Sequence, residues 1–224
     1  MKSFFFKVQE NYQQSIAVSN VIDFWTKQVC RRLAAVIVII ISPTPITPNM
    51  VTVFSFFLNL IANYQLLSGE LRFAALLFFI SFIMDCVDGQ LACLKDVVSN
   101  FGRFFDPVLD GLKDLITFLV IISYFSETNI FYISLIGMFN VSASIVFDWV
   151  RHTIQNMPKD VTESSPNYLQ KLGIVFWSVP TRNFIIVFSF IMQLPEAIVY
   201  YTCFPGIYFT IRKGWALVVM LKKN

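Results

Sequence analysis

Charged residues are scarce in this chain of 224 residues, at 14% of the total, and histidine occurs once. Soluble domains carry about 25% charged residues and about 45–50% apolar ones, whereas 56% of this chain is apolar and 25 residues are phenylalanine. The four cysteines show no C-x2-C pair, which argues against a zinc site and against a disulfide framework. The composition therefore excludes an ordinary soluble protein and indicates a membrane protein.

The beginning of the chain also lacks a sustained apolar core, so no cleavable signal peptide is expected. The run at 33–41 is apolar but far shorter than the roughly 20 residues needed to cross a bilayer. Arg31 and Arg32 precede it, and the proline-rich stretch 42–48 cannot continue a helix. Residues 1–47 are therefore predicted to form a cytoplasmic segment with an amphipathic helix at the membrane interface.

The remainder of the chain, residues 48–224, alternates between long apolar segments and short polar turns. This pattern predicts an all-α membrane protein with six transmembrane helices. The predicted spans cover residues 48–67, 71–94, 102–125, 130–150, 180–193 and 197–210 or beyond. Polar residues gather in the segment 151–181, whose role stays open.

The distribution of basic residues predicts the orientation of these spans. With the chain start inside, all Lys and Arg residues except Arg72 lie on or near the inner side, which is 16 of 17. The positive-inside rule then places both termini at the cytoplasmic face. The acidic residues described next lie at the same face, where a nucleotide would be available.

Two acidic pairs stand at the joint between the second and third predicted spans. Asp85 and Asp88 are spaced i, i+3. Asp106 and Asp110 are spaced i, i+4, so each pair lies on one face of a helix. Carboxylates in or beside a membrane are costly and usually accompany a cation or proton. Without a ring of His or Cys, four converging carboxylates favour Mg²⁺ or Mn²⁺ over zinc.

Two other interpretations explain the positions of the four aspartates less completely. As helix caps or surface ion pairs, Asp106 and Asp110 would suit the start of a helix dipole, but Asp85 and Asp88 stand near a helix end. A cation or proton transporter could use such acids for translocation. Transporter sites, however, usually lie near the bilayer midplane rather than at one end of two helices.

The stretch 85–110 resembles the signature of the CDP-alcohol phosphotransferase (CDP-alcohol phosphatidyltransferase) family, Asp-x2-Asp-Gly-x2-Ala-Arg-x8-Gly-x3-Asp-x3-Asp. The matching positions, with every spacing kept, are Asp85, Asp88, Gly89, Ala92, Gly102, Asp106 and Asp110. The signature arginine is replaced by Cys93. Lys95, two residues on, is a candidate to supply the missing positive charge.

This resemblance implies transfer of a phospho-alcohol group, commonly phosphatidyl, from a CDP-alcohol to an acceptor hydroxyl, with release of CMP, in phospholipid biosynthesis. It implies Mg²⁺ or Mn²⁺ as cofactor and a homodimer among membrane lipids, with no nucleic-acid partner. Two alternatives stay open. The donor could be polar, such as CDP-inositol, or the chain could be a non-catalytic member, because a thiol at Cys93 cannot replace a guanidinium.

The resemblance also implies residue roles. Asp85, Asp88 and Asp106 would be metal ligands, and Asp110 would be the general base and a further metal contact. The implied nucleotide-binding residues are Asn49, Thr52, Asp85, Gly89, Ala92, Ser99 and Gly102. Arg151 and Arg182, at the inner ends of the fourth and fifth spans, are candidates for binding an anionic acceptor.

Overall fold

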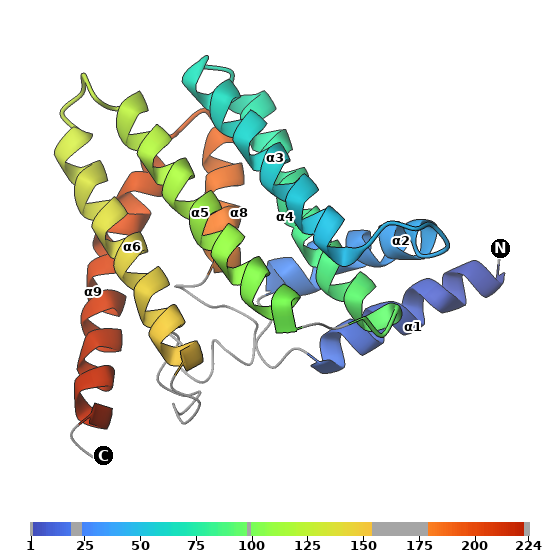
Figure 1. Ribbon diagram of the computed structural model, residues 1–224. Coiled ribbons are helices and arrows are strands. Elements are labelled where there is room, and N and C mark those ends of the chain that lie inside the picture. The colour runs from blue at the N-terminus through green and yellow to red at the C-terminus, as the bar shows by residue number, and fades with distance from the viewer. Residues whose placement is uncertain (1, 19–23, 98–99, 154–178, 222–224) are drawn as a thin grey trace.

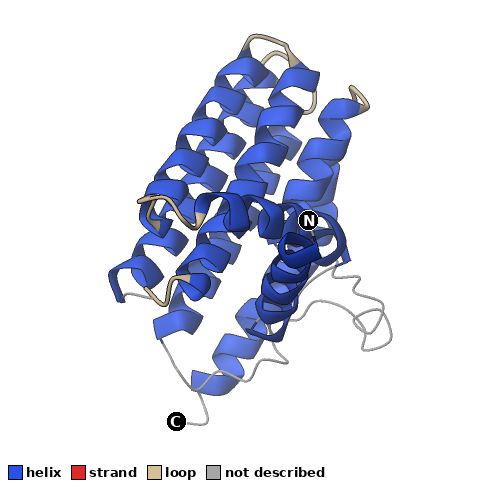
Figure 2. Ribbon diagram, turned by 90° about the vertical axis from the view of Figure 1, so that its right-hand side faces the viewer, coloured by secondary structure: helices blue, strands red, loops and turns tan. Residues whose placement is uncertain are grey.

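The computed structural model describes residues 2–18, 24–97, 100–153 and 179–221, and all secondary structure within these ranges is helical (Figure 2). The elements are α1 (Lys2–Val18), the π-helical turn η1 (Thr26–Cys30), α2 (Arg31–Ile41), α3 (Pro48–Leu67), α4 (Leu71–Leu94), α5 (Asn100–Tyr124), α6 (Phe131–Thr153), α8 (Val179–Ile191) and α9 (Glu196–Leu221). The predicted all-α fold is confirmed for these described residues. The last six helices begin within two residues of the predicted starts.

Local chemistry determines where α3 begins and where α4 begins and ends. Thr47 caps α3: its side-chain oxygen accepts a hydrogen bond from the backbone N–H of Met50 at 3.3 Å, and Pro48 occupies the first turn. Gly69 turns the chain into α4 with a φ of 80°, a left-handed conformation that glycine adopts without strain. Asp96, with a φ of 52°, reverses the chain after α4.

Helices α3, α4, α5, α6, α8 and α9 form a bundle, and α1 and α2 lie across one of its ends (Figure 1). Helix α3 packs against both α4 and α5, whereas α8 packs against α4. At the other edge, α6 and α9 lie side by side (Figure 1). The end of α4 and the start of α5 therefore lie at the same end of the bundle as α1 and α2.

Two apolar cores stabilise this arrangement. The larger core joins the six helices of the bundle. It includes Phe78 and Phe190, whose ring centroids are 6.0 Å apart. Ala62, Ala74 and Ala75 are fully buried within it, and small side chains let helices approach closely. The smaller core fastens α2 to the first half of α3 and the second half of α4, where the aspartates lie. It comprises Cys30, Ala34, Val38, Val51, Phe82, Ile83, Val87 and Leu91.

The outer face of the bundle is strongly apolar. On α3 the exposed side chains include Phe54, Phe57 and Ile61, a surface that is typical of contact with lipid. Among the described helices, α3 alone has both the length and the hydropathy to cross a membrane. Shorter apolar helical stretches cover residues 131–146 and 179–191.

Candidate metal and phosphotransfer site

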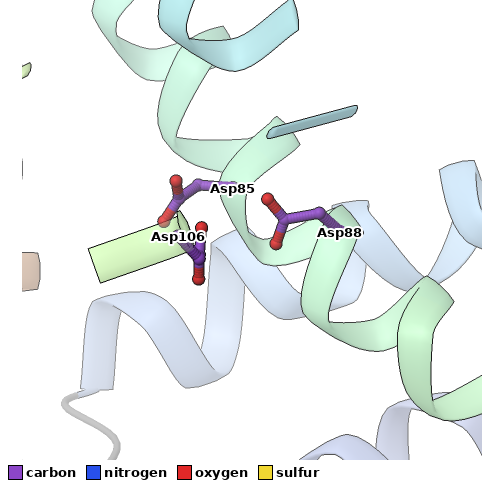
Figure 3. Close-up of side chains that lie close together, drawn as sticks. All are labelled: Asp85, Asp88 and Asp106. Carbon is purple, nitrogen blue, oxygen red and sulfur yellow. The ribbon is translucent and has the colours of Figure 1, made fainter. Parts of the chain in front are cut away.

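Three aspartates converge between α4 and α5. Asp85 and Asp88 come from α4, and Asp106 comes from α5 (Figure 3). Each offers a carboxylate oxygen, and these oxygens all lie within 4.8 Å of one another. Asp88 is buried, at 4% exposed, and the other two are half-buried. The helices thus bring together three of the four residues predicted as metal ligands.

The hydrogen bonds of these three aspartates do not satisfy all of their carboxylate oxygens. Thr52 donates its hydroxyl to Asp88 Oδ2 at 2.6 Å and so orients that carboxylate. The buried Oδ1 of Asp106 has no hydrogen-bond partner among the described residues. Because an unpaired carboxylate oxygen is costly to bury, an oxygen-seeking divalent cation such as Mg²⁺ or Mn²⁺ fits this donor set.

Asp110 lies outside this triad in the described structure and has a different partner. Its Oδ1 is 2.6 Å from the ammonium of Lys113, which is also 2.5 Å from Asp85 Oδ1. The Asp110 side chain is 32% exposed, whereas that of Lys113 is 9% exposed. Lys113 was predicted to lie with the other basic residues on or near the inner side. The signal for its role was its i, i+3 spacing from Asp110.

A small cavity opens beside Asp110, between α3, α4, α5 and α8. Its polar lining residues are Asn59, Ser81, Asp85, Asp110, Lys113, Asp114, Thr117 and Asn183. Asn59, Thr117 and the nearby Asn63 also hydrogen bond to one another within the bundle. These buried polar residues, which sequence analysis missed, continue the site from the carboxylates into the bundle.

The predicted nucleotide-binding residues fall into distinct positions. Thr52 contacts the triad through Asp88. Gly89 is exposed on α4, and a Cβ added there would meet nothing within 4 Å, so a ligand has space beside it. Asn49 lines a neighbouring pocket at the start of α3. Ala92 is half-buried on the last turns of α4. Gly102 lies within α5, and Ser99 lies outside the described residues.

Lys95, the candidate to replace the signature arginine, contacts the loop before α3. Its ammonium donates to the backbone carbonyls of Thr44 and Ile46, each at 2.8 Å. Lys95 therefore fastens the end of α4 to the loop before α3. Cys93 itself is exposed on the last turn of α4.

Arg182, a predicted contact for the acceptor, lies inside the bundle. Arg182 is 2% exposed, and its guanidinium donates a hydrogen bond to Asp114 Oδ2. Because both partners are buried, this ion pair joins α5 to α8 inside the bundle and gives Arg182 a structural partner. Arg151 lies in the last turn of α6, but its side chain is outside the described part of the structure.

A family model described as CDP-alcohol phosphatidyltransferase matches residues 45–219, which include every described member of the site. The chain belongs to this family. The resemblance carried by the signature is therefore confirmed over most of the chain.

Several proteins with similar sequences are named as synthases or phosphatidyltransferases. The chain is 32% identical over 100 residues to the archaetidylinositol phosphate synthase of Pyrococcus horikoshii, across 44% of this chain and 53% of that protein. It is 35% identical over 88 residues to a CDP-diacylglycerol–serine O-phosphatidyltransferase of Helicobacter pylori, across 38% of this chain and 35% of that protein. The matched regions thus span about half or less of these relatives.

A solved structure shares the fold. The phosphatidylinositol phosphate synthase of Mycobacterium tuberculosis, determined with CDP-DAG bound, superposes with a TM-score of 0.64. The superposition covers 83% of this chain and 92% of that one, at 15% sequence identity. The chain therefore has the helical membrane fold of that synthase.

Proposed function

We propose that this protein transfers a phospho-alcohol group, a phosphatidyl group in the first instance, from a CDP-alcohol to an acceptor hydroxyl and releases CMP. Such a reaction belongs to phospholipid biosynthesis. The observation that carries the proposal is the convergence of Asp85, Asp88 and Asp106, with an unpaired buried oxygen on Asp106, in a chain of this family.

In this proposal the three aspartates hold Mg²⁺ or Mn²⁺. When bound, the cation neutralises the diphosphate oxygens of the donor and the charge on departing CMP. Thr52 keeps the Asp88 carboxylate oriented through its hydroxyl. The open face of α4 at Gly89 admits the nucleotide. The remaining proposed nucleotide contacts are Asn49, Asp85, Ala92, Ser99 and Gly102.

Asp110 acts as the general base. The acceptor oxygen attacks the β-phosphorus, the bond from that phosphorus to the bridging oxygen breaks, and CMP leaves with the bonding electrons. The hydroxyl proton passes to Asp110, which is the more exposed carboxylate of the Lys113 pair. A base must lie within hydrogen-bond reach of the proton it accepts. The polar cavity beside Asp110 offers space for the acceptor hydroxyl.

The membrane arrangement belongs to the same proposal. Helices α3, α4, α5, α6, α8 and α9 would make a six-span domain over residues 48–224. Residues 1–47, with α1 and α2, would lie at the cytoplasmic interface, because the basic residues concentrate at that end. The active site would face the cytoplasm, and two copies would form a homodimer. Arg151, rather than the buried Arg182, is the proposed contact for an anionic acceptor.

The residue at position 93 supports a second candidate function, that of a non-catalytic family member. Cys93 stands where the family signature has arginine, and Lys95 is held by two loop carbonyls. A chain lacking that positive charge could bind a CDP-alcohol without turning it over. A polar donor such as CDP-inositol would instead preserve the chemistry and change only the substrate.

The experiment that tests these functions is CMP release by the purified full chain. Donors would include CDP-diacylglycerol and CDP-inositol, and acceptors would include serine, inositol, glycerol 3-phosphate and inositol phosphate, with Mg²⁺ or Mn²⁺. We expect release that requires both the cation and Asp110, and the productive pair would identify the substrates. Binding of the donor without release by any pair would favour the non-catalytic candidate. Absence of donor binding would contradict both.

A further inference from the structure

Lys113 connects three helices of the site. From α5, its ammonium lies 2.5 Å from Asp85 Oδ1 on α4 and 2.6 Å from Asp110 Oδ1 on its own helix. It also donates a hydrogen bond to the Ser55 hydroxyl on α3 at 3.3 Å. At 8% exposed, Lys113 is buried. One side chain thus contacts a proposed metal ligand and the proposed base together.

The carboxylates of Asp85 and Asp110 balance the charge of the buried Lys113 ammonium. An isolated buried ammonium is very costly, and pairing with carboxylates offsets that cost. The next acid along α5, Asp114, is paired with Arg182 and does not compete for Lys113. The residue one turn further, Thr117, hydrogen bonds to Asn59 and Asn63. The contacts of Lys113 are therefore directed at Asp85 and Asp110.

The contact between Lys113 and Asp85 should weaken the binding of a cation. Asp85 belongs to the triad whose oxygens lie within 4.8 Å of one another, so the positive charge of Lys113 lies at the edge of the proposed metal site. A nearby positive charge repels a dication. Without that charge, Asp85 and Asp110 would repel each other before a cation binds.

We propose that Lys113 is a positioning residue that holds Asp85 and Asp110 in place and sets the affinity of the carboxylate site for divalent cations. It stabilises the protein before the cation binds and weakens cation binding in return. It also keeps Asp110 oriented toward the acceptor cavity. This inference rests on the proposed metal site.

The test measures Mn²⁺ affinity by electron paramagnetic resonance on the full chain in detergent, together with thermal unfolding with and without Mn²⁺. For Lys113→Gln we expect Mn²⁺ binding about tenfold tighter, from the lost charge repulsion. We also expect a lower Tm without Mn²⁺ and a larger rise in Tm on adding it. Lys113→Arg keeps the charge and should bind Mn²⁺ within about threefold of the wild type.

A matched lysine serves as the control. Lys95 hydrogen bonds to the carbonyls of Thr44 and Ile46 rather than to the carboxylates. Lys95→Gln should leave Mn²⁺ affinity unchanged. In CMP release, Lys113→Gln should lower kcat, because Asp110 loses the ammonium that holds it in place.

Several results would overturn the proposed role of Lys113. A lower Tm for Lys113→Gln with unchanged or weaker Mn²⁺ affinity would show a merely structural lysine and overturn the proposal. If Lys113→Gln folds only with Mn²⁺ present, its Mn²⁺ should leave more slowly on addition of a chelator than that of the wild type, and faster loss would overturn the proposal. An Mn²⁺ affinity changed more than tenfold in Lys113→Arg would do the same. A wild type that binds no Mn²⁺ would instead contradict the metal site itself.

Discussion

Asp110 and Asp114 stand one helical turn apart on α5, yet their surroundings differ. Asp110 pairs with Lys113, and its side chain is 32% exposed beside the carboxylate triad. Asp114 pairs with Arg182 from α8, and the two side chains are 11% and 3% exposed. The same residue type at the same helical spacing thus occupies an accessible site in one case and a closed ion pair in the other.

Neighbouring helices explain the difference. Helix α4 brings Asp85 to the level of Asp110, whereas α8 brings Arg182 to the level of Asp114. A buried charge with one committed partner is a structural contact, because breaking the pair leaves the other charge unpaired. A partly exposed carboxylate beside other carboxylates can still exchange partners. Position along α5 alone would not have separated these two roles.

Replacing the accessible aspartate should have the largest effect on chemistry. For Asp110→Asn we expect CMP release to fall by about 10²–10⁴-fold, the usual contribution of a general base. Donor binding should persist, because Asp85, Asp88 and Asp106 remain. Turnover assays and donor binding by the same purified variant would check this. Activity within tenfold of wild type would remove Asp110 from the role of base.

Replacing the enclosed aspartate should act on stability instead. Asp114→Asn leaves the Arg182 guanidinium buried without its carboxylate partner, and we expect a loss of about 3–5 kcal/mol in the free energy of unfolding. Thermal and denaturant unfolding in detergent would measure it. Arg182→Met should destabilise similarly, and combining Asp114→Leu with Arg182→Met should recover much of the loss. Full stability in Asp114→Asn would contradict the closed pair.

The helices were predictable from the sequence because apolar runs, the Thr47 cap with Pro48 and the turn at Gly69 are local signals. The triad was predictable because its spacing matches a signature. The partners of Lys113 and Arg182 were not, because each lies on another helix whose rotation and register depend on packing across the bundle. The partners of Lys95 were not predictable for the same reason, since they are carbonyls in a loop distant in the sequence.

The hydroxyl of Thr52 provides a smaller test of the accessible site. Its hydrogen bond to Asp88 Oδ2 holds a buried proposed ligand in place. Removal of such a supporting contact typically lowers metal affinity or activity by about 10–100-fold, and we expect Thr52→Val to fall in this range. Thr52→Ser keeps the hydroxyl and should remain close to wild type. Mn²⁺ binding by both variants would check it, and equal affinities would show that the hydroxyl does not orient Asp88.

The smallest expected effect on the fold concerns Gly89, which can be compared with a second helical glycine. A Cβ at Gly89 would meet nothing within 4 Å, whereas one at Gly137 would lie 2.5 Å from the Thr202 hydroxyl. Gly89→Ala should therefore raise the free energy of unfolding by up to about 1 kcal/mol, through helix propensity. Gly137→Ala should lower it by about 1–3 kcal/mol through overpacking.

These two variants also separate ligand approach from helix packing. If the nucleotide lies against α4 at Gly89, Gly89→Ala should raise the KM for the donor several-fold, because the added methyl group occupies space that is open only in the absence of ligand. The helix itself gains from the same methyl group, so a higher KM cannot come from unfolding. Donor titration at fixed acceptor concentration would measure it. An unchanged KM in a stabilised Gly89→Ala protein would contradict contact between the nucleotide and this face of α4.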